Sequence, residues 1–499
     1  MATAAAAATR VDQPTSVFAK LVYPVSLLAS LSIWLLAVRA PLWVDETLAY
    51  WQVSGGFGRI WSRSAQMPSS IGYLYTLWFA RSILGSQEIA LKIPSMLAML
   101  GAAYFLFRIA RELFGREIAF LTCIFFCTHP DVVFAATDAR PYAFALLATN
   151  LAIFLFIQWM TRHEMRYAIL FGIAAAGILY FHYLFGAILP AFAIYYLAMR
   201  GRSIKADIRQ LAAVLVTFTL LAAPLMVRVV SLFRTRQTHV VLELAQTVVA
   251  LKTFAPEKLL IGFLVAVSVA ALVRKVKLPG RDCFPAILLC PLLAFIPGAI
   301  LYGISAATPL HLFISRYCLV AVSGSVLTWG LLTTRIDSRL LRQMFCVGLV
   351  AVTVFRSYAS PFTRKHELSF KPAFDLVNAD VTQDKAPVLM CSAFIESDYE
   401  PMPAPASENA LLSQASYYRL DVPATLLPFD LNDETIRVAS HSIQEAAQRR
   451  QRFLVIAGPA SYSTLEWLVS YTKGTFAPRL MGEFDGIVVL EFTPSGGGN

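Results

Sequence analysis

The sequence predicts a polytopic all-α membrane protein of about 11 transmembrane helices, followed by a C-terminal extracytoplasmic α/β domain. Two observations support this fold class: a very apolar composition and a change of charge along the chain. Of the 499 residues, 57% are hydrophobic and 15% are charged, whereas soluble proteins carry roughly a quarter charged residues. One soluble core cannot bury so much apolar surface. The composition therefore excludes a cytosolic globular enzyme, a disordered chain and a fibrous repeat.

Charge divides the chain into two parts. Residues 357–499 carry 11 basic and 17 acidic side chains, a net charge of −6, whereas residues 1–356 carry 31 and 14, a net charge of +17. The basic residues of the first part lie in short clusters between apolar runs, which is typical of the cytoplasmic loops of a membrane protein. A nucleic-acid binder would instead gather them on one face. The predicted partner is therefore the lipid bilayer and not a nucleic acid.

Eleven apolar runs approach the length of about 20 residues that a membrane-spanning helix needs. They are residues 18–38, 88–107, 117–136, 141–160, 167–181, 183–199, 210–227, 257–273, 284–304, 313–333 and 340–356. The Ala-rich residues 1–17 are expected to be disordered. Residues 167–199 fit either two short spans or one long kinked helix. With a cytoplasmic N-terminus the basic clusters fall in alternate loops, and an odd number of spans places the tail outside the cytoplasm.

The large outer loops are residues 39–87 and 228–256. Residues 71–84 are apolar but short, and they contain Arg81. Counting them as a span would turn the next basic loop outward, against the positive-inside rule. We therefore expect an amphipathic helix that lies on the outer interface.

The tail, residues 357–499, has the pattern of a small α/β domain. Its buried strands are expected within residues 386–394, 452–459 and 486–492, and its helices at 369–380, 405–418, 440–450 and 462–472. Strands that alternate with helices favour this fold class. The tail contains no G-x-G-x-x-G, P-loop or H-E-x-x-H motif, so no nucleotide cofactor is expected and the tail presents no catalytic motif.

Asp45 and Glu46 form the first candidate site, just beyond the first span and beside Trp43. A carboxylate at the edge of the bilayer needs a partner, a metal or a proton, because its desolvation is unfavourable. Two interpretations are open. The pair is either a helix cap with a solvated acid, or a general base or metal ligand for chemistry at the membrane surface.

Asp138 and Arg140 lie at the outer end of the third span, and Pro141 suits the first turn of the next helix. A guanidinium at the level of lipid head groups can bind a phosphate through two hydrogen bonds, or it can pair with Asp138 or extend to the interface. Lys92 lies one turn inside the second span. An intramembrane lysine is a functional hypothesis by default, and extension to the same interface is its alternative.

Three further positions belong to the outer side. His182 marks the turn between two short spans and is either a ligand or a structural histidine, while Arg316 and Tyr317 open the tenth span. His239 and Glu243 form a weaker pair in the second outer loop. The charged and titratable side chains expected at one membrane face are Asp45, Glu46, Lys92, Asp138, Arg140, His182 and Arg316. The acidic pair Asp45 and Glu46 with three cations at one depth favours an anionic, lipid-embedded substrate such as a polyprenyl phosphate.

Several segments of the chain resemble the GT-C glycosyltransferases, in the branch of protein O-mannosyltransferases, aminoarabinose transferases and bacterial lipid A-core galacturonosyltransferases. The matching segments, in order over residues 20–330, are LWVDETLAYW, EIALKIPSMLAMLGAAYFLFRIARELFG, TDARPYAFALLATN, FHYLFGAILP and ISRYCLV. The resemblance implies a GT-C transmembrane fold over residues 18–356 and an outward active site in a bacterial inner membrane. It also implies a polyprenyl monophosphate sugar donor and inversion at the sugar carbon. The acceptor would be a lipid, a polysaccharide or a protein.

The resemblance also implies residue roles. Asp45 would be the base that deprotonates the acceptor hydroxyl, and Glu46 would assist it or bind a divalent metal with His182. The donor phosphate would be held by Arg140 and Arg316. Lys92 and Tyr142 are further candidates for the phosphate, and Asp138, His182 and Tyr317 are candidates for the rest of the site. A transporter or flippase of a lipid-linked sugar is the alternative from another class, although the sequence shows no convincing internal repeat. A catalytically dead scaffold is a third, against which the intact acidic pair argues.

Overall fold

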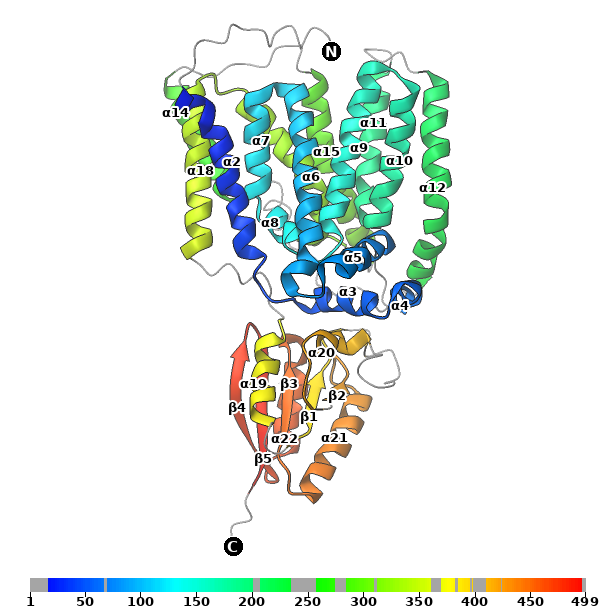
Figure 1. The fold of residues 1–499 in the computed structure, drawn as a ribbon, viewed down its shortest axis with the longest axis vertical. Helices are drawn as coiled ribbons and strands as arrows, with labels where there is room; N and C mark the ends of the chain where they lie inside the picture. Colours follow the sequence, from blue (N-terminus) through cyan, green and yellow to red (C-terminus); the bar gives the residue numbers. More distant parts are fainter. Residues whose placement is uncertain are drawn as a thin grey trace.

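The computed structural model describes residues 17–66, 70–200, 207–234, 257–273, 284–308, 312–359, 369–381, 385–394, 397, 410–422 and 424–495. His239 and Glu243 lie outside these ranges, as does the segment expected to be disordered, except that Val17 begins a helix. Figure 1 shows a bundle of long helices with a small α/β domain at one end. We call this end of the bundle the domain end.

The bundle contains the helices that the apolar runs predict. They are α2 (Val17–Ala37), α6 (Glu88–Phe114), α7 (Arg116–Thr128), α8 (Pro130–Ala136), α9 (Tyr142–Arg162), α10 (Met165–Phe181), α11 (Leu189–Met199), α12 (Ile208–Arg234), α14 (Glu257–Leu272), α15 (Phe284–Ala307), α16 (Ser315–Cys318), α17 (Val322–Thr333) and α18 (Arg339–Ala359). Within the described ranges, six helices are long and apolar enough to cross a membrane, α7 and α8 together form a bent candidate, and four shorter apolar helices accompany them. The helical membrane fold class is confirmed, whereas the number of crossings stays a prediction.

One predicted span is sharply bent, and the run that fitted either one helix or two is divided. The run over residues 117–136 forms α7 and α8, which meet at an angle of 71°. Pro130 begins α8, and a proline there removes a backbone donor and disfavours helical geometry at the preceding residue. The run over residues 167–199 is not one kinked helix. Its backbone is extended at His182 and then forms the 3₁₀ helix η2 (Tyr183–Ile188) before α11.

Helices α15 and α17 approach each other closely at Gly324. A Cβ atom at this position would lie 2.3 Å from the backbone nitrogen of Ala294 and 2.3 Å from the carbonyl carbon of Leu293. Such distances leave no room for any side chain. The glycine therefore allows the two helices to pack backbone against backbone.

Short helices lie across the domain end of the bundle, between it and the α/β domain (Figure 1). They are α3 (Val44–Ser54), η1 (Phe57–Arg59), α4 (Ile60–Gln66) and α5 (Ile71–Leu84). Helix α5 has the bounds expected for the amphipathic helix. The other three lie in a region expected only as an outer loop. These helices are too short to be recognised as membrane-spanning runs in the sequence.

The tail forms the predicted α/β fold. Its elements are α19 (Lys371–Val381), β1 (Val388–Cys391), η7 (Ala410–Leu412), α20 (Ser413–Tyr417), β2 (Ala424–Leu427), α21 (Asp433–Gln448), β3 (Phe453–Ala457), η8 (Pro459–Ser461), α22 (Tyr462–Tyr471), β4 (Phe476–Phe484) and β5 (Ile487–Pro494). The strand order is β2-β1-β3-β5-β4, with β1 parallel to β2 and β3, and β5 antiparallel to β3 and β4.

Strands β2 and β4 were not expected from the sequence. Strand β2 has only four residues, and β4 contains Pro478 and a register shift near Gly482. These features are tolerated because β4 is an edge strand that pairs only with β5. Helix α21 begins earlier than expected because Asn432 caps it, accepting a hydrogen bond from the Thr435 backbone N–H at 2.9 Å.

The domain packs directly on α3. Val44, Leu48 and Trp51 of this helix share one buried apolar cluster with Phe370 and Phe374 of the tail. The helix that carries the predicted acidic pair is therefore held between the bundle and the domain.

Candidate active site

Glu46 is a buried structural link at the start of α3. Its Oε2 accepts a hydrogen bond from the Trp43 backbone N–H at 3.1 Å, and its Oε1 accepts one from the Ala139 N–H at 2.7 Å. The first bond is half of a capping box, in which the third helical residue binds the cap backbone. The second joins α3 to the turn before α9. Both oxygens are engaged and the side chain has no exposed surface, so the geometry favours a structural role over the predicted metal or assisting role.

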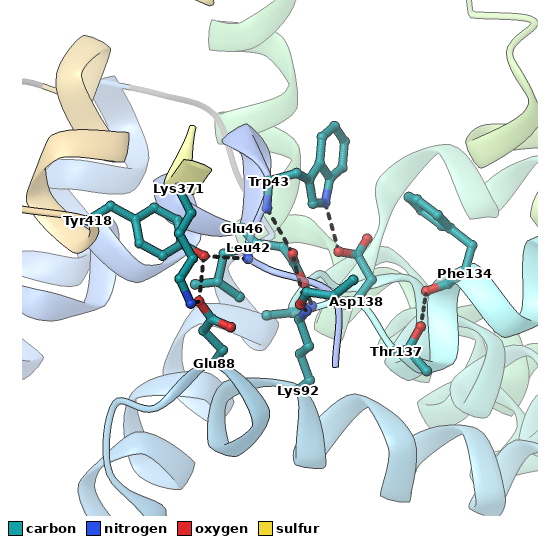
Figure 2. A network of polar contacts seen from close by, with 12 residues as sticks. Leu42, Trp43, Glu46, Glu88, Lys92, Phe134, Thr137, Asp138, Lys371 and Tyr418 are labelled. Carbon is teal, nitrogen blue, oxygen red and sulfur yellow. Dashed lines mark hydrogen bonds and ion pairs between the residues drawn. The ribbon is translucent and has the colours of Figure 1, made fainter. Parts of the chain in front are cut away.

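Lys92 is the charge partner of Glu46. Its Nζ lies 3.8 Å from Glu46 Oε2 and donates a hydrogen bond to the Ala40 carbonyl, and neither charged side chain is exposed to solvent (Figure 2). Lys92 neither extends to the interface nor presents its ammonium group to an open surface. Its role toward a donor phosphate stays a prediction that this burial does not favour.

Asp138 lies beside Trp43, the residue that caps α3. It is fully buried, and its Oδ1 accepts a hydrogen bond from Trp43 Nε1 at 2.9 Å (Figure 2). The Trp43 ring in turn packs against Phe134 in an edge arrangement. Asp138 therefore fixes the residue that caps α3.

Asp45 faces a different environment from Glu46. Its Oδ2 lies 3.2 Å from Arg316 Nη1 and 3.7 Å from Arg140 Nη2, and the carboxylate is 18% exposed. Arg140 also donates from Nη1 to the Asp45 carbonyl at 3.1 Å. The three residues come from α3, the turn before α9 and the start of α16. The fold therefore brings together two cations and one acid that the sequence separates by up to 271 positions.

The two guanidinium groups outnumber the carboxylate that they bind. The Nε atoms of Arg140 and Arg316 are both buried without a hydrogen-bond partner in the described structure. Burial alone would lower the pKa of Arg140, but Asp45 and then Tyr142 and Asp138 outweigh it and raise the pKa. Asp45, Arg140 and Arg316 together carry a net positive charge and have unsatisfied donors, which suits an anion with several oxygen acceptors.

Aromatic rings complete this region around His182. The centroid of its ring lies 5.3 Å from that of Tyr142 and 5.4 Å from that of Tyr317, and the Arg316 guanidinium lies 5.5 Å from the Tyr317 centroid. Burial, and then the two arginines, lowers the pKa of His182 to about 3. Its Nδ1 atom is buried and has no hydrogen-bond partner in the described structure. The histidine is therefore a neutral group beside the cations.

A metal site is not formed by the residues that were proposed for it. In the part of the chain that the structure describes, no three or more His, Cys, Asp and Glu side chains gather where they could hold a metal ion. Both Glu46 oxygens already accept backbone hydrogen bonds. Among the described residues, Glu46 and His182 are therefore not part of a larger set of metal ligands.

Trp43 and the backbone of Ala139 are contributors to the site that the sequence reasoning did not assign. The capping box has a local signal, since its glutamate lies three residues after the cap residue. The contact with Ala139 has none, because it joins segments 93 residues apart.

Comparison with known proteins gives two kinds of match. Residues 68–227 match the family model described as dolichyl-phosphate-mannose-protein mannosyltransferase. The fold is similar to that of ArnT from Cupriavidus metallidurans bound to undecaprenyl phosphate, with a TM-score of 0.54 and 12% identity over 94% of this chain and 97% of that chain. The apo form of ArnT gives a TM-score of 0.52 with the same identity and coverage. A search of curated proteins finds no match.

A third solved structure, the oligosaccharyltransferase of Archaeoglobus fulgidus tethered with an acceptor peptide, has a TM-score of 0.41 and 10% identity over 88% of this chain and 69% of that chain. The family match and the ArnT fold confirm the resemblance to GT-C glycosyltransferases. The family match over residues 68–227 supports a glycosyltransferase.

Proposed function

We propose that this protein transfers a sugar from a polyprenyl monophosphate donor to a hydroxyl group of an envelope acceptor, with inversion at the sugar carbon. The acceptor is a lipid, a polysaccharide or a protein. The reaction takes place at the domain end of the bundle, which we assign to the outer face of a bacterial inner membrane. The observation that carries this proposal is the position of Asp45 between Arg140 and Arg316.

The two arginines suit the donor phosphate. Their Nε atoms lack partners in the described structure, and a phosphate offers several acceptor oxygens. Guanidinium groups that are already oriented stabilise negative charge as it develops on a leaving phosphate. The similar fold of ArnT binds undecaprenyl phosphate, and this supports a lipid-linked monophosphate as the donor class here.

Asp45 suits the role of base. It is a partly exposed carboxylate in the cluster, so an acceptor hydroxyl can reach it. In the proposed reaction the hydroxyl loses its proton to Asp45 and its oxygen attacks the sugar carbon. The bond between that carbon and the phosphate oxygen then breaks, and the phosphate leaves with the electron pair beside the arginines. Attack opposite to the leaving phosphate gives inversion.

The test is an Asp45→Asn variant, assayed in proteoliposomes with polyprenyl-phosphate sugars and envelope extracts. We expect kcat to fall at least about 100-fold, as is usual when a general base is removed, while the donor KM changes little. Asp207→Asn is the control, because that aspartate is exposed and precedes α12. Full activity of the Asp45→Asn protein would exclude Asp45 as the base.

Arg316→Gln gives the complementary result in the same assay. We expect the donor KM to rise about tenfold, which corresponds to about 1.4 kcal/mol, with a smaller rise for Arg316→Lys because lysine keeps the charge but not the two-pronged geometry. An unchanged donor KM in the glutamine variant would remove Arg316 from the phosphate site.

A further inference from the structure

The hydroxyl group of Tyr418 joins the α/β domain to two segments of the membrane part. It accepts a hydrogen bond from the Leu42 backbone N–H at 2.6 Å and donates one to Glu88 Oε1 at 2.8 Å (Figure 2). Lys371, also from the tail, lies with its Nζ 3.2 Å from the same Glu88 oxygen. We call Tyr418, Lys371 and Glu88, with the Leu42 N–H, the tyrosine clamp.

Both membrane segments held by the tyrosine clamp lead to the acidic pair. Leu42 is fully buried and lies three residues before Asp45. Glu88 is the first residue of α6, and Lys92, one turn later in that helix, pairs with Glu46. The clamp therefore fixes the entry to α3 from two directions, although Tyr418 does not contact Asp45 itself in any described interaction.

The chemistry of the clamp suits a permanent connection. Burial, and then the neighbouring Glu88 carboxylate, raises the pKa of Tyr418, so the hydroxyl keeps its proton and remains a donor. The Leu42 N–H is a buried backbone donor, which needs a partner. Apolar packing of α3 against Phe370 and Phe374 supports the same interface.

From these contacts we propose that the C-terminal domain positions Asp45 between its two arginines, and that Tyr418 is the positioning residue through which it acts. This inference rests on the proposed function and deepens it, since it gives the tail a role in the reaction. Asp45 has to hold its place to within a fraction of an ångström, because small misplacements of a catalytic group reduce the rate strongly. Helix α3 is short, and its first turn depends on contacts with other segments.

The test compares Tyr418→Phe with Tyr417→Phe in the full-length protein. The first change removes both hydrogen bonds of the clamp and keeps the ring. The second removes a hydroxyl at the same interface, the one that donates to the Ser86 carbonyl at 2.8 Å. For Tyr418→Phe we expect kcat to fall roughly 10- to 100-fold, with the donor KM within about twofold of wild type. For Tyr417→Phe we expect kcat within about threefold of wild type.

Glu88→Gln separates the hydroxyl from the ion pair. Glutamine still offers an oxygen to Tyr418 but loses the charge that attracts Lys371, so we expect most of the wild-type kcat to remain. A loss as large as that of Tyr418→Phe would assign the positioning to the ion pair and overturn the role of the Tyr418 hydroxyl. Equal kcat in the wild type and Tyr418→Phe would overturn the inference while leaving the proposed function intact.

Hydrogen exchange tests the clamp without any assay of transfer. Tyr418→Phe should increase exchange in peptides covering residues 40–54 and leave α21 of the tail protected, which shows that the domain is still folded. If the wild type transfers no sugar but exchange over residues 40–54 still increases in Tyr418→Phe, the proposed function is wrong and the structural role of the tyrosine clamp is supported. Unchanged exchange over residues 40–54 would show that the tyrosine clamp does not hold this segment.

Discussion

Asp45 and Glu46 are neighbours in the chain with opposite surroundings. Consecutive residues of a helix point about 100° apart, so one side chain can enter the core while the next faces an opening. Glu46 accepts two backbone hydrogen bonds and is fully buried, whereas Asp45 is partly exposed and contacts two arginines. We therefore assign a structural role to Glu46 and a catalytic role to Asp45.

This difference in surroundings predicts different losses of stability for two similar substitutions. Glu46→Gln leaves the buried Lys92 without its counter-charge, and we expect a loss of about 3 kcal/mol in stability. Asp45→Asn should change stability little, because Arg140 and Arg316 are partly exposed. Thermal unfolding of the detergent-solubilised variants measures both. A second variant, Glu46→Gln with Lys92→Met, should recover part of the loss, and a larger loss in the double variant would contradict the assigned pairing.

The acidic pair and the arginines of the site were accessible to sequence reasoning because each lies at the end of an apolar run. Their partners were not. One of the interpretations left open by the sequence paired Arg140 with Asp138, two residues away. The described structure places Arg140 beside Asp45 and gives Asp138 a hydrogen bond from Trp43. Contacts between segments more than 90 residues apart depend on the packing of whole helices. No local pattern encodes them.

At the scale of elements, long regular helices follow from the sequence and short irregular ones do not. An apolar run of about 20 residues has few alternatives to a helix in a bilayer, and each predicted span coincides with a helix or helix pair. Helix α3 and strand β4 were missed for different reasons. The first is short and lies in a predicted outer loop, and the second contains Pro478 at a sheet edge where its missing N–H is tolerated.

The contact of α15 with α17 gives an element-scale prediction. Gly324→Ala places a Cβ atom within 2.3 Å of two backbone atoms of α15, so the helices have to separate. We expect a loss of at least about 2 kcal/mol in stability, measured by thermal unfolding. Gly303→Ala in α15 is the matched control, because a Cβ there meets nothing within 4 Å, and it should be neutral or slightly stabilising. Equal stability of the two variants would contradict the close approach.

At the scale of the molecule, charge and position agree. The acidic tail lies at one end of the bundle (Figure 1), while the basic clusters predicted for the cytoplasm include Arg166 in the first turn of α10. The positive-inside rule then assigns the domain end to the outside. This orientation is a prediction of the charge pattern.

Labelling with a membrane-impermeant maleimide tests the orientation. The described cysteines are all buried, and Cys283 lies outside the described residues, so the background carries Cys283→Ser. We expect Lys473→Cys, exposed in the tail, to react in spheroplasts with an intact inner membrane. Arg166→Cys, 63% exposed in its native form, should react only after the membrane is permeabilised. The reverse labelling pattern would show that the domain end faces the cytoplasm and would contradict the predicted orientation.

The hydrogen bond from Leu42 to Tyr418 joins residues 376 positions apart, and this has a consequence for biosynthesis. Domains generally fold in order from the N-terminus during synthesis, so α3 reaches the membrane long before the residue that holds it. A chain that stops before Tyr418 would contain Asp45 and both arginines but lack the tyrosine clamp. With the role inferred for Tyr418, full activity would begin only after the α/β domain has crossed the membrane and folded, which ties the onset of activity to the synthesis of this domain.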